Sequence, residues 1–170
     1  MPTGLKSTSS VVAIGFSANE SAPNTFTQET IDLNLSPLDR EVFVVLAINL
    51  DPSNPDALAG IDTSFSAALT STRQTVVANL SFANCLATSS NAIRAGGMID
   101  SGVGFQRTSS DAPVSGLDYI GIIATSDFHV QVQGSNNLAA GKVDGKLYGY
   151  RATASADIFA ALVQSEVLSA

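Results

Sequence analysis

The sequence predicts an all-β fold, an antiparallel jelly-roll sandwich of eight strands followed by a short C-terminal α-helix. From residue 11 to residue 151, β-branched and aliphatic residues alternate with Ser, Thr, Asn and Gln, which is the two-residue period of half-buried strands. Turn-forming Gly, Pro, Asn and Asp interrupt this pattern at short intervals, and no alternation of strands with helices is visible. Eight short strands suit a jelly roll, in which two Greek keys form two packed sheets.

Eight segments carry the strand pattern. They are residues 11–18, 25–35, 42–50, 63–72, 74–80, 118–124, 128–133 and 142–151. The segment 42–50 is apolar on both faces, which predicts a strand covered on both sides, within a sandwich or beneath a neighbouring subunit. Residues 83–116 contain Ser, Asn and Gly throughout, so we expect an irregular segment there.

The chain of 170 residues is long enough for one core and is expected to form one domain with two terminal additions. Residues 1–10 are rich in Pro, Gly, Ser and Thr and predict a flexible N-terminal arm. Residues 11–153 form the predicted jelly-roll domain. Residues 154–170 form a helix and tail, packed on or beside the sandwich, with Ser155 or Asp157 as the N-terminal cap.

Composition and charge exclude several classes of protein. The net charge is −7 and only one cation lies in the first 24 residues, which argues against nucleic-acid binding through a basic arm. The single cysteine cannot form an intramolecular disulfide, and no apolar run approaches the ~18 residues of a membrane-spanning helix. Because Lys and Glu are scarce and interface cores are depleted in them, much of the surface is expected to be buried in an assembly. A neutral β-protein without partners is the alternative.

Catalytic residues are not predicted. His129 is the only histidine, and Ser126 and Asp127 precede it closely. Neighbours on one strand do not converge on a single point as a catalytic triad must, so a polar residue facing outward is the better interpretation of His129. A hydrolase would need a nucleophile and a base within reach of each other. No cofactor is expected.

One loop has oxygen-bearing side chains that a calcium ion could use. Hard cations take several oxygen ligands from a loop, but two prolines here also explain the segment as a rigid turn without metal. The candidate ligands are Asp51, Asn54, Asp56 and Asp62.

The C-terminal segment has an apolar stripe at helical spacing, made of Ile158, Phe159, Leu162 and Val163. An isolated helix of about four turns is marginal in water, so this one must dock on its own sandwich or on a neighbouring subunit. A lipid surface is disfavoured because the polar face lacks Lys and Arg. We predict that Phe159 is buried and that Phe159, Leu162 and Val163 lie at or beside a subunit contact.

Five stretches carry a resemblance to a known family. They are residues 37–45 (PLDREVFVV), 118–125 (DYIGIIAT), 132–137 (VQGSNN), 147–151 (LYGYR) and 156–163 (ADIFAALV). Together they resemble the single-jelly-roll major capsid proteins of small icosahedral viruses, of the kind found in environmental and marine viral sequences. The resemblance spans most of the chain from about residue 36 onward and contains no catalytic motif.

This resemblance implies a structural protein of the virion and no active site. Such a subunit assembles with copies of itself, and in a mixed shell with other capsid proteins, into an icosahedral shell. Many capsid proteins that package a genome have a basic arm, and its absence here argues against direct genome contact by this chain. The alternative is a lectin-like or fibre-head sandwich that binds sugars, for which Tyr119, Tyr148 and Tyr150 are the available stacking residues.

Overall fold

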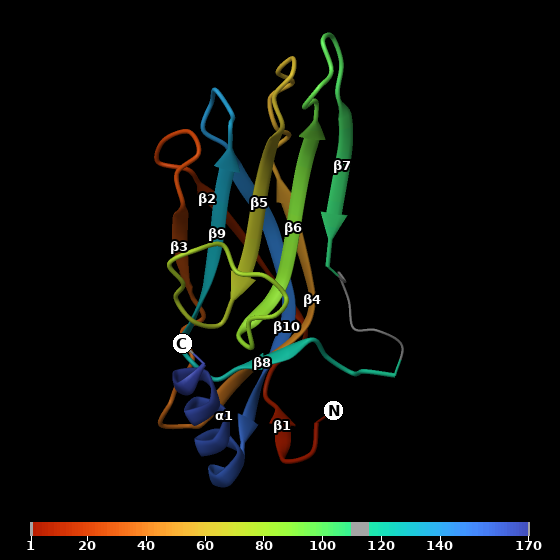
Figure 1. Cartoon of the computed structure of the whole chain (residues 1–170). Coiled ribbons are helices and arrows are strands. Elements are labelled where there is room, and N and C mark those ends of the chain that lie inside the picture. The colour runs from red at the N-terminus through yellow and green to blue at the C-terminus, as the bar shows by residue number, and fades with distance from the viewer. Residues whose placement is uncertain (1, 110–115, 170) are drawn as a thin grey trace.

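The computed structural model describes residues 2–109 and 116–169, and these residues form ten strands and one helix (Figure 1). In chain order the elements are β1 (Leu5–Ser7), β2 (Val12–Asn19), β3 (Thr27–Asp32), β4 (Glu41–Pro52), β5 (Thr63–Thr70), β6 (Cys85–Arg94), β7 (Val103–Thr108), β8 (Gly121–Ile123), β9 (Asp127–Ser135), β10 (Lys142–Ala154) and α1 (Ala156–Leu168).

Two antiparallel sheets form the sandwich. In the first sheet β10 lies between β4 and the edge formed by β1 and β2, and β8 follows β4. The second sheet has the order β3–β9–β5–β6–β7. Apart from β1 and β7, the strand orders β2–β10–β4–β8 and β3–β9–β5–β6 are those of a jelly roll built from two Greek keys. The predicted fold class is confirmed. Seven of the eight expected strands are present, as β2, β3, β4, β5, β8, β9 and β10, whereas β1, β6 and β7 were not expected.

The main core lies between the two sheets and is built by the two-residue alternation. Phe128, Val130 and Val132 of β9 are fully buried in it, as their shared face predicts. The ring of Phe16 in the first sheet meets that of Phe128 in the second at 5.6 Å in an edge-to-face geometry. These contacts fix the two sheets face to face.

A second apolar cluster covers the outer face of the first sheet. Strand β4 alternates between the two clusters, so that Val42 and Val44 face away from the main core. There they meet Ala152 and Ala154 of β10 and the apolar stripe of α1. The prediction that this strand is covered on both faces is confirmed, and its second cover is the chain's own helix. No helix in residues 2–109 and 116–169 is long and apolar enough to cross a membrane.

The predicted flexible arm is wrong for residues 5–7. This segment forms β1, which pairs with β10 from Leu5 opposite Ala154 to Ser7 opposite Ala152, and Leu5 is buried. Strands β1 and β2 pair with the same edge of β10, β1 near the C-terminal end of β10 and β2 nearer its N-terminal end. Three residues are too few to show a strand period in the sequence, so its turn-rich flanks dominated the expectation.

Two further expectations are wrong. Residues 74–80 are not a strand but part of a loop that covers the outer face of the second sheet, where the Ala78 N–H donates to Gln131 Oε1 (3.0 Å). Residues 83–116 are not irregular as a whole, because β6 and β7 form an antiparallel hairpin within them. In β6 the inward positions include Ser89 and Asn91 in place of aliphatic residues, so the apolar alternation that marks a strand is absent. Residues 110–115 of this segment lie outside the described residues.

Candidate functional site: polar clusters, the helix and the strand edges

His129 serves the fold. It lies on the outer face of β9, as predicted, but its side chain is only 4% exposed because the loop before β6 covers this face. Its Nδ1 lies 3.0 Å from Thr30 Oγ1 on the adjacent strand, and Nε2 lies 3.9 Å from the Asp127 carboxylate. Burial holds the pKa of His129 below its usual value, against the opposing charge of Asp127. The imidazole therefore links β9 to β3.

Two of the four candidate calcium ligands, Asp56 and Asp62, are hydrogen-bonded to different parts of the chain, whereas Asp51 and Asn54 line one hollow. Asp62 accepts hydrogen bonds from Arg94 (2.9 Å) and from the N–H groups of Ala95 and Gly96 (both 2.8 Å), and these hydrogen bonds lower its pKa. The Asp56 carboxylate instead accepts from the Leu138 N–H (2.8 Å). In the described ranges, no group of three or more His, Cys, Asp or Glu side chains could hold a metal ion. The loop carboxylates of Asp56 and Asp62 thus secure two different chain segments.

The apolar stripe of α1 packs on its own sandwich. Phe159, Leu162 and Val163 are half-buried against the second cluster, so Phe159 is less covered within the subunit than predicted. Ser155 occupies the N-terminal cap position, but its side chain forms no capping hydrogen bond. The helix end carries Val167 and Leu168, both exposed. A subunit contact at this helix remains a prediction.

Glu166 fastens α1 to the sandwich. Its carboxylate accepts hydrogen bonds from the backbone N–H groups of Ala124 (3.0 Å) and Thr125 (2.9 Å), at the turn between β8 and β9. The residue is only 8% exposed, and burial raises its pKa despite these two donors. Glu20 is used in the same way, since its carboxylate accepts from the Gly134 and Gly141 N–H groups. The sequence marks neither residue, because each is a single acid in a polar context.

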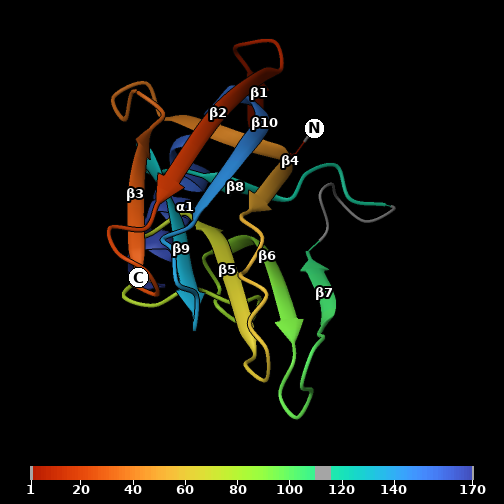
Figure 2. The same cartoon turned by 90° about the horizontal axis from the view of Figure 1, so that it is seen from above.

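Strand β7 is the most open edge of the sandwich. All six of its residues are exposed, and in the described structure it is paired only with β6. Val103 is 47% exposed and Phe105 is 53% exposed, and the hairpin turn before them exposes Met98 and Ile99 as well. Figure 2 shows β7 at the rim of the second sheet, set apart from the first.

The three tyrosines are not free stacking platforms. Tyr119 and Tyr150 pack against the second cluster, beside the helix. Tyr148 is half-buried on β10. The exposed aromatic faces that a sugar site based on stacking uses are therefore not found at these positions.

Comparisons with known proteins find similarity to solved structures. No known protein family and no curated protein matches the chain. A solved structure described as Desmodium yellow mottle tymovirus matches 91% of this chain and 94% of its own chain, with 11% sequence identity and a TM-score of 0.30. The fold assignment above rests on the strand order and not on this likeness.

Proposed function

We propose that this chain is a structural capsid protein, which assembles with copies of itself into the icosahedral shell of a virion. The jelly roll occurs in viral capsid proteins and in lectins, so the fold alone does not decide between them. The observation that carries the proposal is the open, apolar edge of the second sheet at β7.

A strand edge presents a row of unpaired backbone N–H and C=O groups, which is a template for pairing with another chain. Proteins that remain monomeric protect such edges with charged side chains, especially Lys, and with Pro, bulges or covering loops. Strand β7 contains neither Lys nor Pro, its one charged residue is Arg107, and its register with β6 has no bulge. It adds the half-exposed side chains of Val103 and Phe105 to the open backbone. A second copy of this chain is the partner that is always present.

The buried polar side chains support a structural role over a catalytic one. His129 bonds to Thr30, Glu166 holds the helix and Glu20 holds the turns around β9 and β10. Each group is engaged by the chain itself, whereas a general acid or base must reach a substrate. The proposed subunit is therefore not an enzyme and uses no cofactor.

The partners in this proposal are copies of the subunit and, in a mixed shell, other capsid proteins. Of the first 24 residues only Lys6 is basic, and the chain carries an excess of seven negative charges. Contact with a genome through a basic arm is therefore not part of the proposed function.

The experiment compares two single substitutions by sedimentation and electron microscopy. Phe105→Lys places a charge on the β7 edge, whereas Leu38→Lys places the same charge on a turn residue that is 94% exposed. We expect particles from the wild-type protein and from L38K, and folded, unassembled subunits from F105K. Normal particles from F105K would show that the β7 edge is not an assembly contact.

A further inference from the structure

The outer face of the second sheet carries a straight row of polar side chains from four neighbouring strands. In the strand register Gln133 of β9 lies opposite Ser66 of β5, Ser66 lies opposite Ser90 of β6, and Ser90 lies opposite Arg107 of β7. Cross-strand partners point to the same side of a sheet, so all four side chains share this face. With adjacent strands about 4.8 Å apart, the row is roughly 14 Å long.

These side chains are not used by the fold. Within the described residues, none of the four forms a side-chain hydrogen bond or an ion pair. Gln131, two residues from Gln133 on the same face, is different, because its amide bonds to Thr70 Oγ1 (2.8 Å) and to the Ala78 N–H (3.0 Å). The loop before β6 thus satisfies the polar groups that it covers and leaves the next row free.

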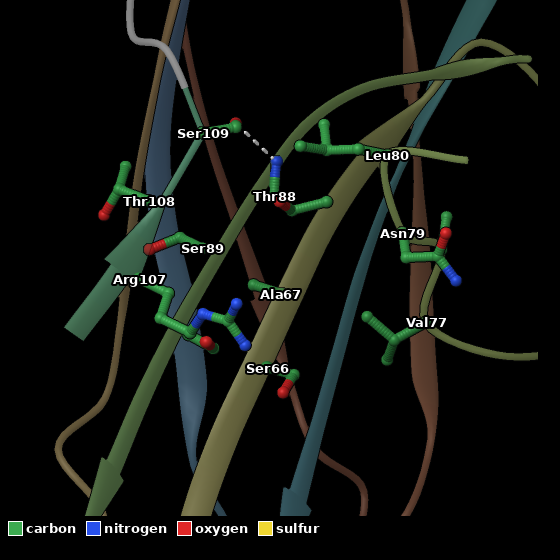
Figure 3. A pocket seen from close by; sticks show the side chains of 12 residues that line it. Ser66, Ala67, Val77, Asn79, Leu80, Thr88, Ser89, Arg107, Thr108 and Ser109 are labelled. Atoms are coloured by element: carbon green, nitrogen blue, oxygen red, sulfur yellow. Dashed lines mark hydrogen bonds between the residues drawn. The ribbon is translucent and has the colours of Figure 1, made fainter. Parts of the chain in front are cut away.

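Two neighbouring hollows lie along this row. One, of about 430 Å³, is lined by Ser66, Ser90 and Arg107, and Figure 3 shows the Arg107 side chain extending over the floor toward Ser66. The other, of about 500 Å³, also includes Ser66 and continues to Gln133. Residues 77–79 of the covering loop line both hollows. The row is therefore the floor of a groove with one raised side, which we call the polar groove.

The charge of the groove defines what fits it. Among residues 2–109 and 116–169, Arg107 is the single charged residue that lines the groove, and no Asp or Glu of these ranges lines either hollow. A guanidinium recognises a carboxylate or sulfate in paired hydrogen bonds, while serine hydroxyls and a glutamine amide donate to and accept from alcohols. A nucleic-acid strand would need several cations and stacking aromatics, and an anionic membrane would need a basic cluster. The described residues that line the groove include one cation and no aromatic side chain.

We infer that the polar groove binds an acidic oligosaccharide. Arg107 takes the carboxylate or sulfate group, and Ser90, Ser66 and Gln133 hydrogen-bond the sugar hydroxyls along the row. The aliphatic side chains of Val77 and Leu80 contact the apolar C–H face of the sugar from the raised side. This inference does not depend on assembly, because every residue of the groove belongs to one subunit.

The test is titration calorimetry on unassembled subunits with three probes of equal length. These are an oligogalacturonate, a sulfated oligogalactan and a neutral oligogalactan, with free sulfate as a fourth titrant. We expect one or both acidic probes to bind and the neutral probe to bind at least roughly tenfold more weakly, the loss that one charge-assisted contact implies. The preferred acidic probe identifies the acid group.

Two variants locate the binding. Arg107→Ala should lower the affinity for the acidic probe about tenfold. Lys146→Ala removes an exposed cation from the other sheet and should leave this affinity unchanged. Ser66→Val should also weaken binding without altering the charge. The inference is overturned if no probe binds, or if the neutral and acidic probes bind with equal affinity. It is also overturned if free sulfate binds as tightly as the saccharide, or if R107A binds the acidic probe as tightly as the wild-type protein does. Particle formation is scored separately, so failure of saccharide binding and failure of shell assembly are distinguishable.

Discussion

The contact of Glu166 with the β8–β9 turn predicts a measurable part of the stability of the subunit. In Glu166→Ala the N–H groups of Ala124 and Thr125 lose their acceptor. An unsatisfied buried donor costs about 1–3 kcal/mol. Ala124 is buried, whereas Thr125 is half-buried and partly open to replacement by water, and the variant no longer has to desolvate a carboxylate. We therefore expect the free energy of unfolding to fall by about 2–3 kcal/mol.

Chemical and thermal denaturation followed by circular dichroism measures this loss. For a chain of this length it corresponds to a Tm lower by about 5–10 °C. Gln164→Ala is the matched control, because it shortens an exposed polar residue on the same helix. If E166A were no less stable than Q164A, Glu166 would not hold the helix to the sandwich, and α1 would be free to act mainly between subunits.

The remaining predictions concern the helix, the sheet and pH. Phe159→Asp should lower the free energy of unfolding of the single subunit by about 2–3 kcal/mol in urea titrations, whereas Val167→Asp, which is exposed, should leave it nearly unchanged. Gly149→Ala should cost about 1–3 kcal/mol or prevent folding, because a Cβ there meets a carbonyl and a phenyl ring of β4, while Gly15→Ala has open space and should cost nothing. Burial raises the Glu166 pKa above 4.5, so the folded state binds this proton more tightly than the unfolded state. The stability of the wild-type protein relative to Glu166→Gln should therefore be highest near and below pH 4.5 and fall as pH rises through the raised pKa, as measured by urea titration at a series of pH values.

Each of these three predictions can fail in a way that contradicts the structure. A stable F159D subunit that no longer assembles would place the helix at a subunit contact and not on its own sandwich. Equal stability of G149A and G15A would mean that β10 and β4 are not packed as described. A pH-independent difference between the wild-type protein and E166Q would mean that the Glu166 carboxyl is not buried.

The sequence predicted the parts of the fold in which burial follows a regular period. Phe128, Val130 and Val132 alternate with polar residues and are buried in the core. The apolar run in β4 predicted a strand covered on both sides, because both of its faces are indeed covered. The helix was visible because its stripe has the 3.6-residue period.

Strands β6 and β7 were missed because their burial does not follow hydrophobicity. Asn91 points inward and is buried because its amide donates to the Pro52 carbonyl (2.9 Å), a partner that lies far away in sequence. Strand β7 is exposed on both faces, so no period distinguishes it from a loop. Residues 77 and 78 led to the opposite error, a loop interpreted as a strand. Their apolar side chains belong to the loop that covers the sheet, and in the sequence such residues resemble those of a strand.

The polar groove could not be predicted from sequence, because it depends on register. Gln133, Ser66, Ser90 and Arg107 are far apart in the chain, and each is an ordinary surface residue for its type. Only the pairing of four strands places them in one row. The side-chain pattern within each strand contains no information on its neighbour's register beyond the choice of face.

Imaging the purified protein by electron cryomicroscopy shows whether this jelly roll is the subunit of a shell. We expect closed icosahedral particles in which β7 of every subunit lies against a neighbouring copy. A protein that stays monomeric at all concentrations and salt conditions, or particles in which the β7 edge faces solvent, would contradict it.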